Sequence, residues 1–336
     1  MWSRLATLNR PTSSRPAATP PIIPLAKLYL TCVLSGICAC SSVCLAQDLA
    51  PRAYLITPLH SNAVTLSTSF FTGSILFNPT LPISDVTANP KIVILSLYHS
   101  LNLFGRSANI VLALPYGVGH FQGTVLGTHG EIYRSGLLDF TARFSVNLKG
   151  GPAMSPKDFR SWQQKTLIGA SLTVVAPTGQ YDPARLVNQG NNRWAFKPEL
   201  GFSRRRGHWI IDAYGGVWFF TTNPTYFSNN QFSPGINTLK QKPIGSFEGH
   251  LSYDVRPRLW VSLDGNFWYG GKNVLNGMEA SNSYQANSRV GATLSVPVSK
   301  HHAVKFSYAN GAYIRLGGDY QTVSVAWQYS WLGRPK

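Results

Sequence analysis

Residues 137–149 read LLDFTARFSVNLK, and from residue 138 onward they alternate between apolar and polar side chains. Phe140 and Phe144 would share one face of an extended chain, while Thr141 and Arg143 would share the opposite face. This period of two residues is typical of a β-strand whose faces meet different surroundings. About ten residues rising about 3.3 Å each, in a strand tilted about 45°, match the thickness of a lipid bilayer. The stretch therefore predicts a strand that can cross a membrane.

The composition favours this interpretation over a soluble β-sandwich. Only 13% of the residues are charged and 12% are aromatic, whereas a soluble domain carries about a quarter charged residues. A sandwich also alternates, but its outward face would be rich in Lys and Glu. Outside the N-terminal region no window resembles a membrane helix of about 20 apolar residues. A closed barrel is the other structure that crosses a bilayer.

The same pattern recurs along the chain. We therefore predict an all-β fold, a transmembrane antiparallel up-and-down β-barrel of outer-membrane type with about twelve strands. The predicted strands are 62–72, 91–102, 107–116, 138–149, 164–176, 192–204, 207–222, 241–255, 257–271, 285–298, 301–316 and 320–332.

Short and long connections between these segments alternate, as in barrels with short periplasmic turns and longer outer loops. The exceptions are 150–163, which is long for a turn, and Gly317-Gly318, which is short for a loop. The predicted outer loops are 73–90, 117–137, 177–191, 223–240 and 272–284.

The polar insert 177–191 could be mistaken for a phosphate-binding loop. Such a loop needs a Lys-Ser/Thr pair and a helix directly after it. Here Thr178-Gly179 is followed by Gln-Tyr-Asp-Pro, and the residues after Asn192 alternate like a strand. We interpret the insert as the third outer loop.

The N-terminal region reads as a signal peptide at residues 1–46. It carries four bases and no acid, and its apolar part ends in small residues at Ala46. An inner-membrane anchor is disfavoured because Ser and Gly interrupt the apolar stretch. All four cysteines lie in this region, so the mature chain would have neither disulfides nor cysteine-based zinc sites. The predicted location is the outer membrane of a Gram-negative bacterium.

Residues 47–61 form a separate N-terminal segment before the barrel proper at 62–336. Prolines interrupt the segment too often for a strand, yet Leu55, Ile56 and Leu59 would avoid water. A twelve-stranded lumen is intermediate between one filled by side chains and an open channel. We predict that this segment plugs the periplasmic mouth.

Several stretches together resemble one family. They are LPYGVG from Leu114, GLLDFTARFSVNLKGGPAMS from Gly136, APTGQYDPARLVNQGNNRWAFKPELGFS from Ala176 and the aromatic last strand. They resemble the outer-membrane transporter family named after the meta-cleavage pathway of phenol degradation, over roughly Ala53 to Trp331. The resemblance implies an exported barrel for uptake of aromatic or other apolar compounds. LGRPK follows Trp331, which departs from the terminal aromatic residue that the barrel-assembly machinery usually recognises.

Charged residues on the inferred lumen faces are the candidate constriction. They either neutralise one another, because an unpaired buried charge is costly, or form a path that selects solutes. Both interpretations stay open, and they can coexist. The residues are Asp139, Arg143, Arg193, Lys197, Glu199, Asp212, Glu248, Asp254, Asp264, Arg289, Lys305 and Arg315.

A basic rim is predicted at the periplasmic turns, in a chain whose formal charge is +17. An exported membrane protein is a poor candidate for binding nucleic acid, so anionic lipid headgroups are the expected partner. The rim comprises Arg204, Arg205, Arg206, Arg256 and Arg258. Aromatic residues near strand ends are assigned to interfacial girdles: Trp209, Trp218, Trp268, Tyr269 and Trp331.

No enzyme signature emerges. There is no G-x-S-x-G motif, and His250, Ser252 and Asp254 would lie in line on one strand, about 7 Å apart at each step, too far apart for a triad. We expect no metal and no cofactor. The favoured function is a passive channel for small, aromatic or hydrophobic solutes. A structural or adhesion barrel acting through its outer loops is the alternative, and a membrane hydrolase is the remote one. Nothing in the sequence addresses oligomeric state.

Overall fold

A computed structural model of the chain describes residues 49–76, 83–125, 128–230 and 233–333. The predicted signal peptide, residues 1–46, lies outside the described residues. Among those that are described, no helix is long and apolar enough to cross a bilayer.

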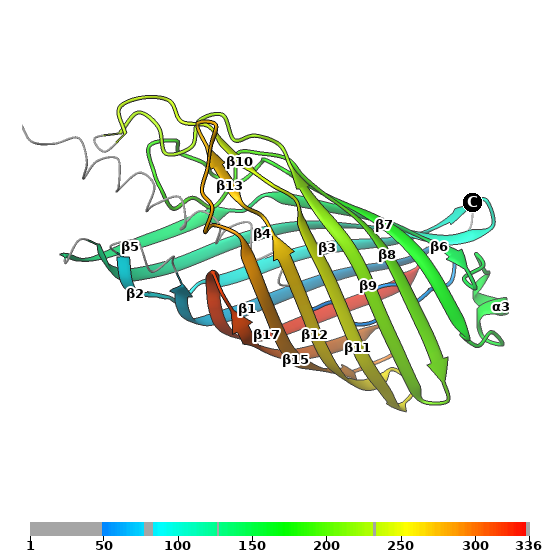
Figure 1. Cartoon of the computed structure of the whole chain (residues 1–336). Helices are drawn as coiled ribbons and strands as arrows, with labels where there is room; N and C mark the ends of the chain where they lie inside the picture. Colours follow the sequence, from blue (N-terminus) through cyan, green and yellow to red (C-terminus); the bar gives the residue numbers. More distant parts are fainter. Residues whose placement is uncertain (1–48, 77–82, 126–127, 231–232, 334–336) are drawn as a thin grey trace, which may run out of the picture.

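Twelve long strands form a closed antiparallel barrel, which confirms the predicted fold and strand number (Figure 1). The ring closes where the first strand pairs with the last, from Ser61↔Leu332 to Leu76↔Gly317. In order around the barrel the strands are β1 (Ser61–Leu76), β3 (Lys91–Leu103), β4 (Arg106–Val125), β6 (Phe140–Lys149), β7 (Thr166–Ala176), β8 (Ala195–Arg206), β9 (Trp209–Phe220), β11 (Ile244–Arg256), β12 (Leu259–Gly270), β15 (Gln285–Pro297), β16 (His302–Ile314) and β17 (Gly317–Leu332).

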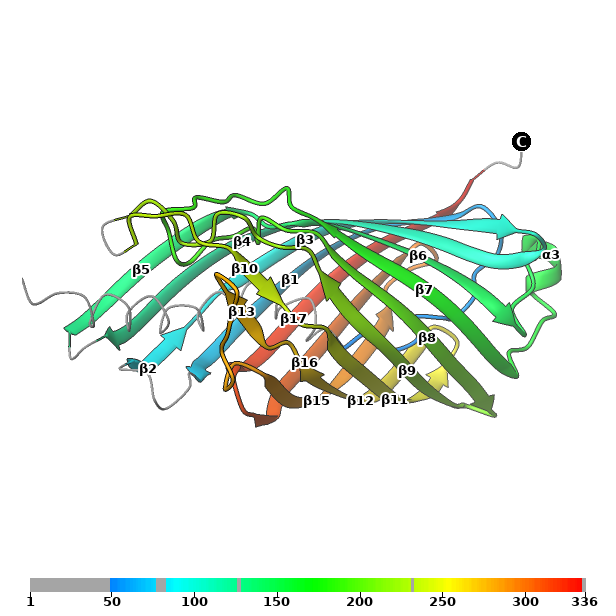
Figure 2. The same ribbon diagram turned by 45° about the horizontal axis from the view of Figure 1, so that its top comes forward.

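The two ends of the barrel differ, as Figure 2 shows. One end carries the short turns, the start of β1, the end of β17 and the helix α3 (Pro156–Phe159). Ser155 caps this helix by accepting a hydrogen bond from the Asp158 amide, and Pro156 occupies a position where its missing N–H is not needed. This single helical turn accounts for the unusual length of the 150–163 connection.

The opposite end is more structured than predicted. Residues 117–137 were expected to be a loop, but β4 continues to Val125 and pairs with β5 (Thr128–Leu137). In the first outer connection, β2 (Ile83–Ala88) pairs with β1 and β4. β10 (Leu239–Gln241), β13 (Asn273–Leu275) and β14 (Met278–Glu279) form a small second sheet. These pairings between loops have no period that sequence reading could detect.

Alternation decides which side chains enter the lumen, and it corrects two aromatic assignments. Trp218 and Trp268 were placed in the interfacial girdle, but they point inward and pack with Val175, Ala195 and Ile244. Trp268 is 0% exposed, and its indole N–H donates to Gln285 Oε1 over 2.8 Å. Trp209, Tyr269 and Trp331 are on the exposed outer face.

Strand β3 is apolar on both faces, which is why its sequence does not show its orientation. Val93, Leu95 and Leu97 are exposed on the outer face, and His99 has the same parity. The imidazole of His99 has a hydrogen-bond partner on this outer face, because its Nδ1 lies 2.7 Å from Asn62 Oδ1 of β1.

Candidate functional site

The segment before β1 enters the barrel at the end with the short turns: Leu49, Ala50 and Ala53 line the interior cavity, whereas His60 is exposed at the rim. Tyr54 is 1% exposed and Ile56 is 5% exposed. The Tyr54 ring occupies a recess above Gly169 of β7 and Gly201 of β8, where any added Cβ would overlap the ring. The ring also meets Tyr214 edge-on, with centroids 5.1 Å apart. The two glycines therefore accommodate Tyr54 by lacking side chains.

The wall holds this segment through individual hydrogen bonds rather than a strand ladder. The Arg52 amide donates to Asp212 Oδ2 over 3.3 Å, and the Ala53 amide donates to the Tyr214 hydroxyl over 3.1 Å. The Thr57 hydroxyl lies 2.8 Å from the hydroxyl of Tyr98. Anchors of this kind can release without disturbing the barrel's own hydrogen bonds.

Arg52 is a central contact that the sequence analysis missed. Its Nη1 lies 2.7 Å from Asp254 Oδ1, and its guanidinium stacks 4.3 Å from the Trp260 ring centroid. Arg205 approaches the other oxygen of Asp254 at 2.6 Å. The only available signal was that Arg52 is the sole base in a segment predicted to enter a lumen that contains acids.

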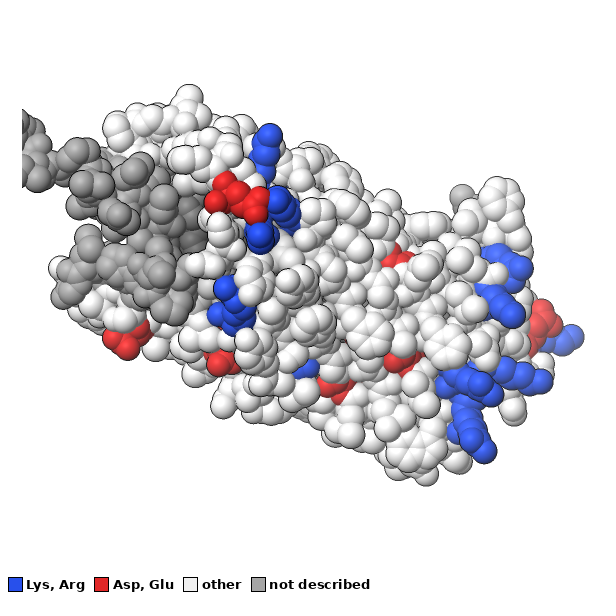
Figure 3. Space-filling model, in the orientation of Figure 1, with Lys and Arg blue, Asp and Glu red and all other residues white. Residues whose placement is uncertain are grey.

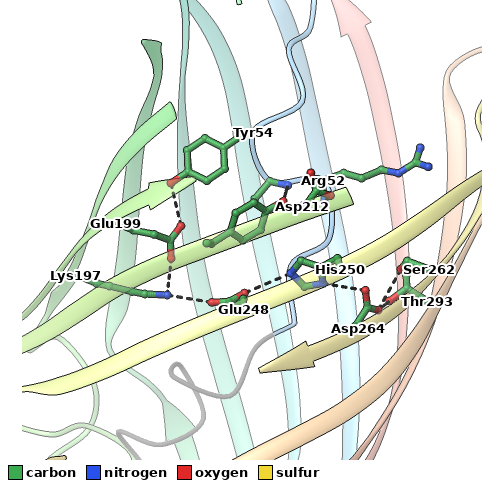
Figure 4. Close-up of polar contacts among 12 residues, drawn as sticks. Arg52, Tyr54, Lys197, Glu199, Asp212, Glu248, His250, Ser262, Asp264 and Thr293 are labelled. Atoms are coloured by element: carbon green, nitrogen blue, oxygen red, sulfur yellow. Dashed lines mark hydrogen bonds and ion pairs between the residues drawn. The ribbon is translucent and has the colours of Figure 1, made fainter. Parts of the chain in front are cut away.

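A chain of alternating charges crosses the lumen wall (Figure 4). Lys197 Nζ lies 2.6 Å from Glu199 Oε2 and 3.0 Å from Glu248 Oε1. Glu248 lies 3.7 Å from His250, whose other ring nitrogen lies 2.9 Å from Asp264 Oδ1. Three carboxylates, one ammonium and one imidazole from β8, β11 and β12 thus form one connected series of contacts.

The two ends of this chain are capped by neutral or cationic donors. Glu199 also accepts from the Tyr54 hydroxyl at 3.0 Å and from Arg143 at 3.3 Å. Asp264 accepts from the Thr293 hydroxyl at 2.7 Å and from Ser262. The N-terminal segment is therefore part of the network, through Tyr54.

Other predicted lumen residues lie nearer the outer loops. Asp139 accepts from the amides of Gly179 and Asn191, each over 2.9 Å, and so secures the third outer loop. Arg193 donates to Gln241 over 2.6 Å. Arg289 is 2% exposed and donates to Thr322.

Arg315 does not belong to the lumen set. It follows the end of β16 and stacks 3.6 Å from the centroid of the Tyr284 ring. Its Nη1 donates to the carbonyls of Asn282 and Tyr284. The prediction was wrong because the alternation was extended past the last residue of the strand.

The basic rim is also smaller than predicted. Figure 3 shows Lys and Arg gathered at the end with the short turns. Arg204, Arg206 and Arg256 are exposed there, but Arg205 turns inward to Asp254. Arg258 donates to the carbonyls of the neighbouring 298–301 turn at 2.8 and 2.9 Å. Arg205 therefore leaves the rim, whereas Arg258 stays exposed at its turn.

A cavity of about 470 Å³ lies between the N-terminal segment and the outer loops. Hydroxyl and apolar side chains of β1, β3, β4 and β17 line one wall. The charged residues of β6, β8, β11, β15 and β16 line the other. Leu49, Ala50 and Ala53 of the segment also line the cavity, so the segment closes one side of it.

Among the described residues, His250 and its neighbours form neither a hydrolytic triad nor a metal centre. His250 contacts Asp264, and no hydrogen bond joins it to Ser252 among the described residues. Within the same part of the chain, no group of three His, Cys, Asp or Glu side chains could hold a metal ion.

The position of Tyr54 leads to a prediction that leaves the segment's own sequence intact. Changing Gly201→Val should push the Tyr54 ring out of its recess and increase ionic current through reconstituted protein. Gly215→Val is the matched control, because Gly215 has open space around it on the neighbouring strand. Equal currents in the two variants would show that the ring's seat does not control passage.

A family model described as "Putative MetA-pathway of phenol degradation" matches residues 96–312. No curated protein sequence matches the chain.

Among solved structures, an outer membrane channel from Pseudomonas putida F1 is similar, with a TM-score of 0.68 at 15% identity, over 84% of this chain and 100% of that chain. The beta domain of the Bordetella autotransporter BrkA gives 0.47 at 13% identity, over 81% and 100% of the two chains. The transport unit of the autotransporter AIDA-I from Escherichia coli gives 0.46 at 9% identity, over 92% and 98%. The first comparison supports the outer-membrane type of barrel.

Proposed function

This chain belongs to the MetA-pathway phenol-degradation family, and from that premise we propose that it is a passive outer-membrane channel for small, aromatic or hydrophobic solutes. The cavity inside the closed barrel carries this proposal. Its volume of about 470 Å³ falls within the range of about 300–1,000 Å³ for small-molecule sites. The space suits one compact solute and excludes folded macromolecules.

We further propose that the N-terminal segment, residues 49–60, is a plug. Leu49, Ala50 and Ala53 line the cavity from the side of the short turns, and Tyr54 and Ile56 are buried beside them. A solute therefore passes only when the segment moves aside. Its separate anchors make such movement compatible with an intact barrel.

Liposome swelling tests the channel proposal. Proteoliposomes should swell faster than protein-free liposomes in isosmotic solutions of small solutes such as arabinose, and the rate should fall steeply with solute size. If neither the full mature chain nor a chain lacking the segment caused swelling above the protein-free rate, transport would be refuted.

The alternative, a structural or adhesion barrel, is favoured by the packing of the outer loops. Leu186, Tyr226, Phe227, Leu239 and Leu275 form a buried cluster there. Such a rigid outer surface could present a binding face. Normal swelling after this cluster's loops are shortened, combined with loss of cell attachment, would support this alternative alongside transport.

The exposed rim is proposed to contact anionic lipid headgroups in the periplasmic leaflet. The double variant Arg204→Gln, Arg206→Gln should need about tenfold more phosphatidylglycerol than the unchanged protein for the same rise in unfolding temperature. Added salt should reduce this difference between the two proteins. Lys91→Gln with Lys240→Gln is the control, since both bases lie at the opposite end. Thermal unfolding in detergent with increasing lipid measures the effect, and equal lipid responses in the two double variants would refute the contact.

The barrel-assembly machinery is the proposed partner during insertion.

A further inference from the structure

The charged wall of the cavity is not electrically balanced. Three carboxylates and four bases line it: Asp139, Glu199, Glu248, Arg143, Lys197, Arg289 and Lys305. All three carboxylates are already occupied. Three N–H groups hold Asp139, and the Lys197 chain engages both glutamates.

Lys305 stands apart from this network. It is exposed and lines the cavity from β16. Among the residues that the structure describes, its ammonium forms no ion pair or hydrogen bond. Its partners in the strand register are Ser295 on β15 and Ala326 on β17, neither of which carries a charge. A base without a countercharge inside a confined lumen attracts anions.

Hydroxyl groups line the same cavity as Lys305. Thr65 and Ser67 of β1, Ser307 of β16 and Ser324 of β17 line the same cavity. Hydroxyls can donate to a carboxylate and can also be satisfied by water when no solute is present. The hydrogen-bonding capacity near Lys305 therefore suits an anion's oxygen atoms.

The wall formed by β1, β3 and β4 provides the second half of a solute site. Phe71, Ile92, Ile94 and Val111 line the cavity there, and no charged residue of those strands does so. A solute with an apolar body and one negative charge can meet both walls at once. An uncharged apolar solute would leave the ammonium and hydroxyls unused.

We propose that the lumen holds a binding site for small amphipathic carboxylates, in which Lys305 pairs with the carboxylate and the apolar wall contacts the body. This inference rests on the proposed channel function and specifies its solute class. Lys305 thus determines which solutes the lumen prefers.

Binding of benzoate and its neutral counterpart benzamide tests the proposal. Equilibrium dialysis at pH 8, with the full mature protein in detergent, should show benzoate binding about tenfold more tightly than benzamide. Lys305→Gln should abolish this preference, whereas Lys305→Arg should retain it. Lys300→Gln, which removes an exposed base from the adjacent turn, should leave the preference unchanged.

Equal binding of the two compounds would overturn the inference, as would a benzoate preference that survives Lys305→Gln. Ionic current from the same samples separates this failure from that of the channel itself. Current without benzoate binding refutes only the carboxylate site, while absence of any current refutes the channel.

Discussion

Deleting residues 49–59 should raise the single-channel conductance in planar bilayers by about threefold or more, because a twelve-stranded lumen is wider than the eight-stranded lumen that side chains fill. The deletion removes Arg52, Tyr54 and Ile56, which together fill the mouth at the end with the short turns. No hydrogen bond of the barrel's strand ladder is lost, since β1 begins at Ser61. The expected product is an intact barrel with a wider path.

Folding of this variant must be shown independently. Heat-modifiable migration in detergent gels reports whether the strands still close. A folded variant whose conductance equals that of the full mature chain would mean that the segment is not a plug. A conductance rise that Gly201→Val partly reproduces would identify the seat of Tyr54 as the critical contact.

Changing Lys197→Met should cause the largest loss of stability that a single substitution produces in the lumen. Lys197 lies between Glu199 and Glu248, both of them buried. Without it, the two carboxylates keep Arg143, Tyr54 and the more distant His250 as their side-chain partners among the described residues. Breaking a buried ion pair from one side typically costs about 3–5 kcal/mol. We therefore expect a clear fall in the urea concentration at the midpoint of unfolding.

Lys300→Met is the matched control for that experiment. It removes the same charge from an exposed turn, where an isolated base contributes little to stability. Similar unfolding midpoints for the two variants would show that the charge chain is not a stabilising element. In that case the bases and acids would be retained for their effect on passing solutes.

The barrel was predictable because its main rule is local. A period of two residues assigns each side chain to lumen or lipid, and this rule alone is enough to place Lys197, Glu199 and Glu248 on the lumen side. The girdle assignment of Trp218 failed because aromatic preference for the interface is only statistical, whereas parity on β9 is geometric. Where both faces are apolar, as on β3, the rule gives no answer.

The remaining errors and omissions are non-local. Arg315 was misplaced because alternation does not mark where a strand ends. Arg52 was missed because a Pro-interrupted segment has no period, so its partners Asp254 and Trp260 follow only from the fold. The pairing of β10 with β13 joins loops about thirty residues apart in a way that turn chemistry does not encode.

If residues 49–60 are a plug, solutes pass only when this segment moves. Residues 47–336 contain no cysteine, so a pair introduced as Ala53→Cys and Tyr214→Cys would react alone. Both positions line the cavity, and the Ala53 amide lies 3.1 Å from the Tyr214 hydroxyl. A short bis-methanethiosulfonate reagent can therefore bridge them, and a reductant can release the bridge.

Arabinose influx into proteoliposomes should be measured before bridging, after bridging and after reduction, with mass spectrometry to verify each state and both single-cysteine variants as controls. Influx should fall to the protein-free level in the bridged protein and return on reduction, while neither reagent should change the influx through the single-cysteine variants. Unaltered influx through fully bridged protein would contradict the proposed plug.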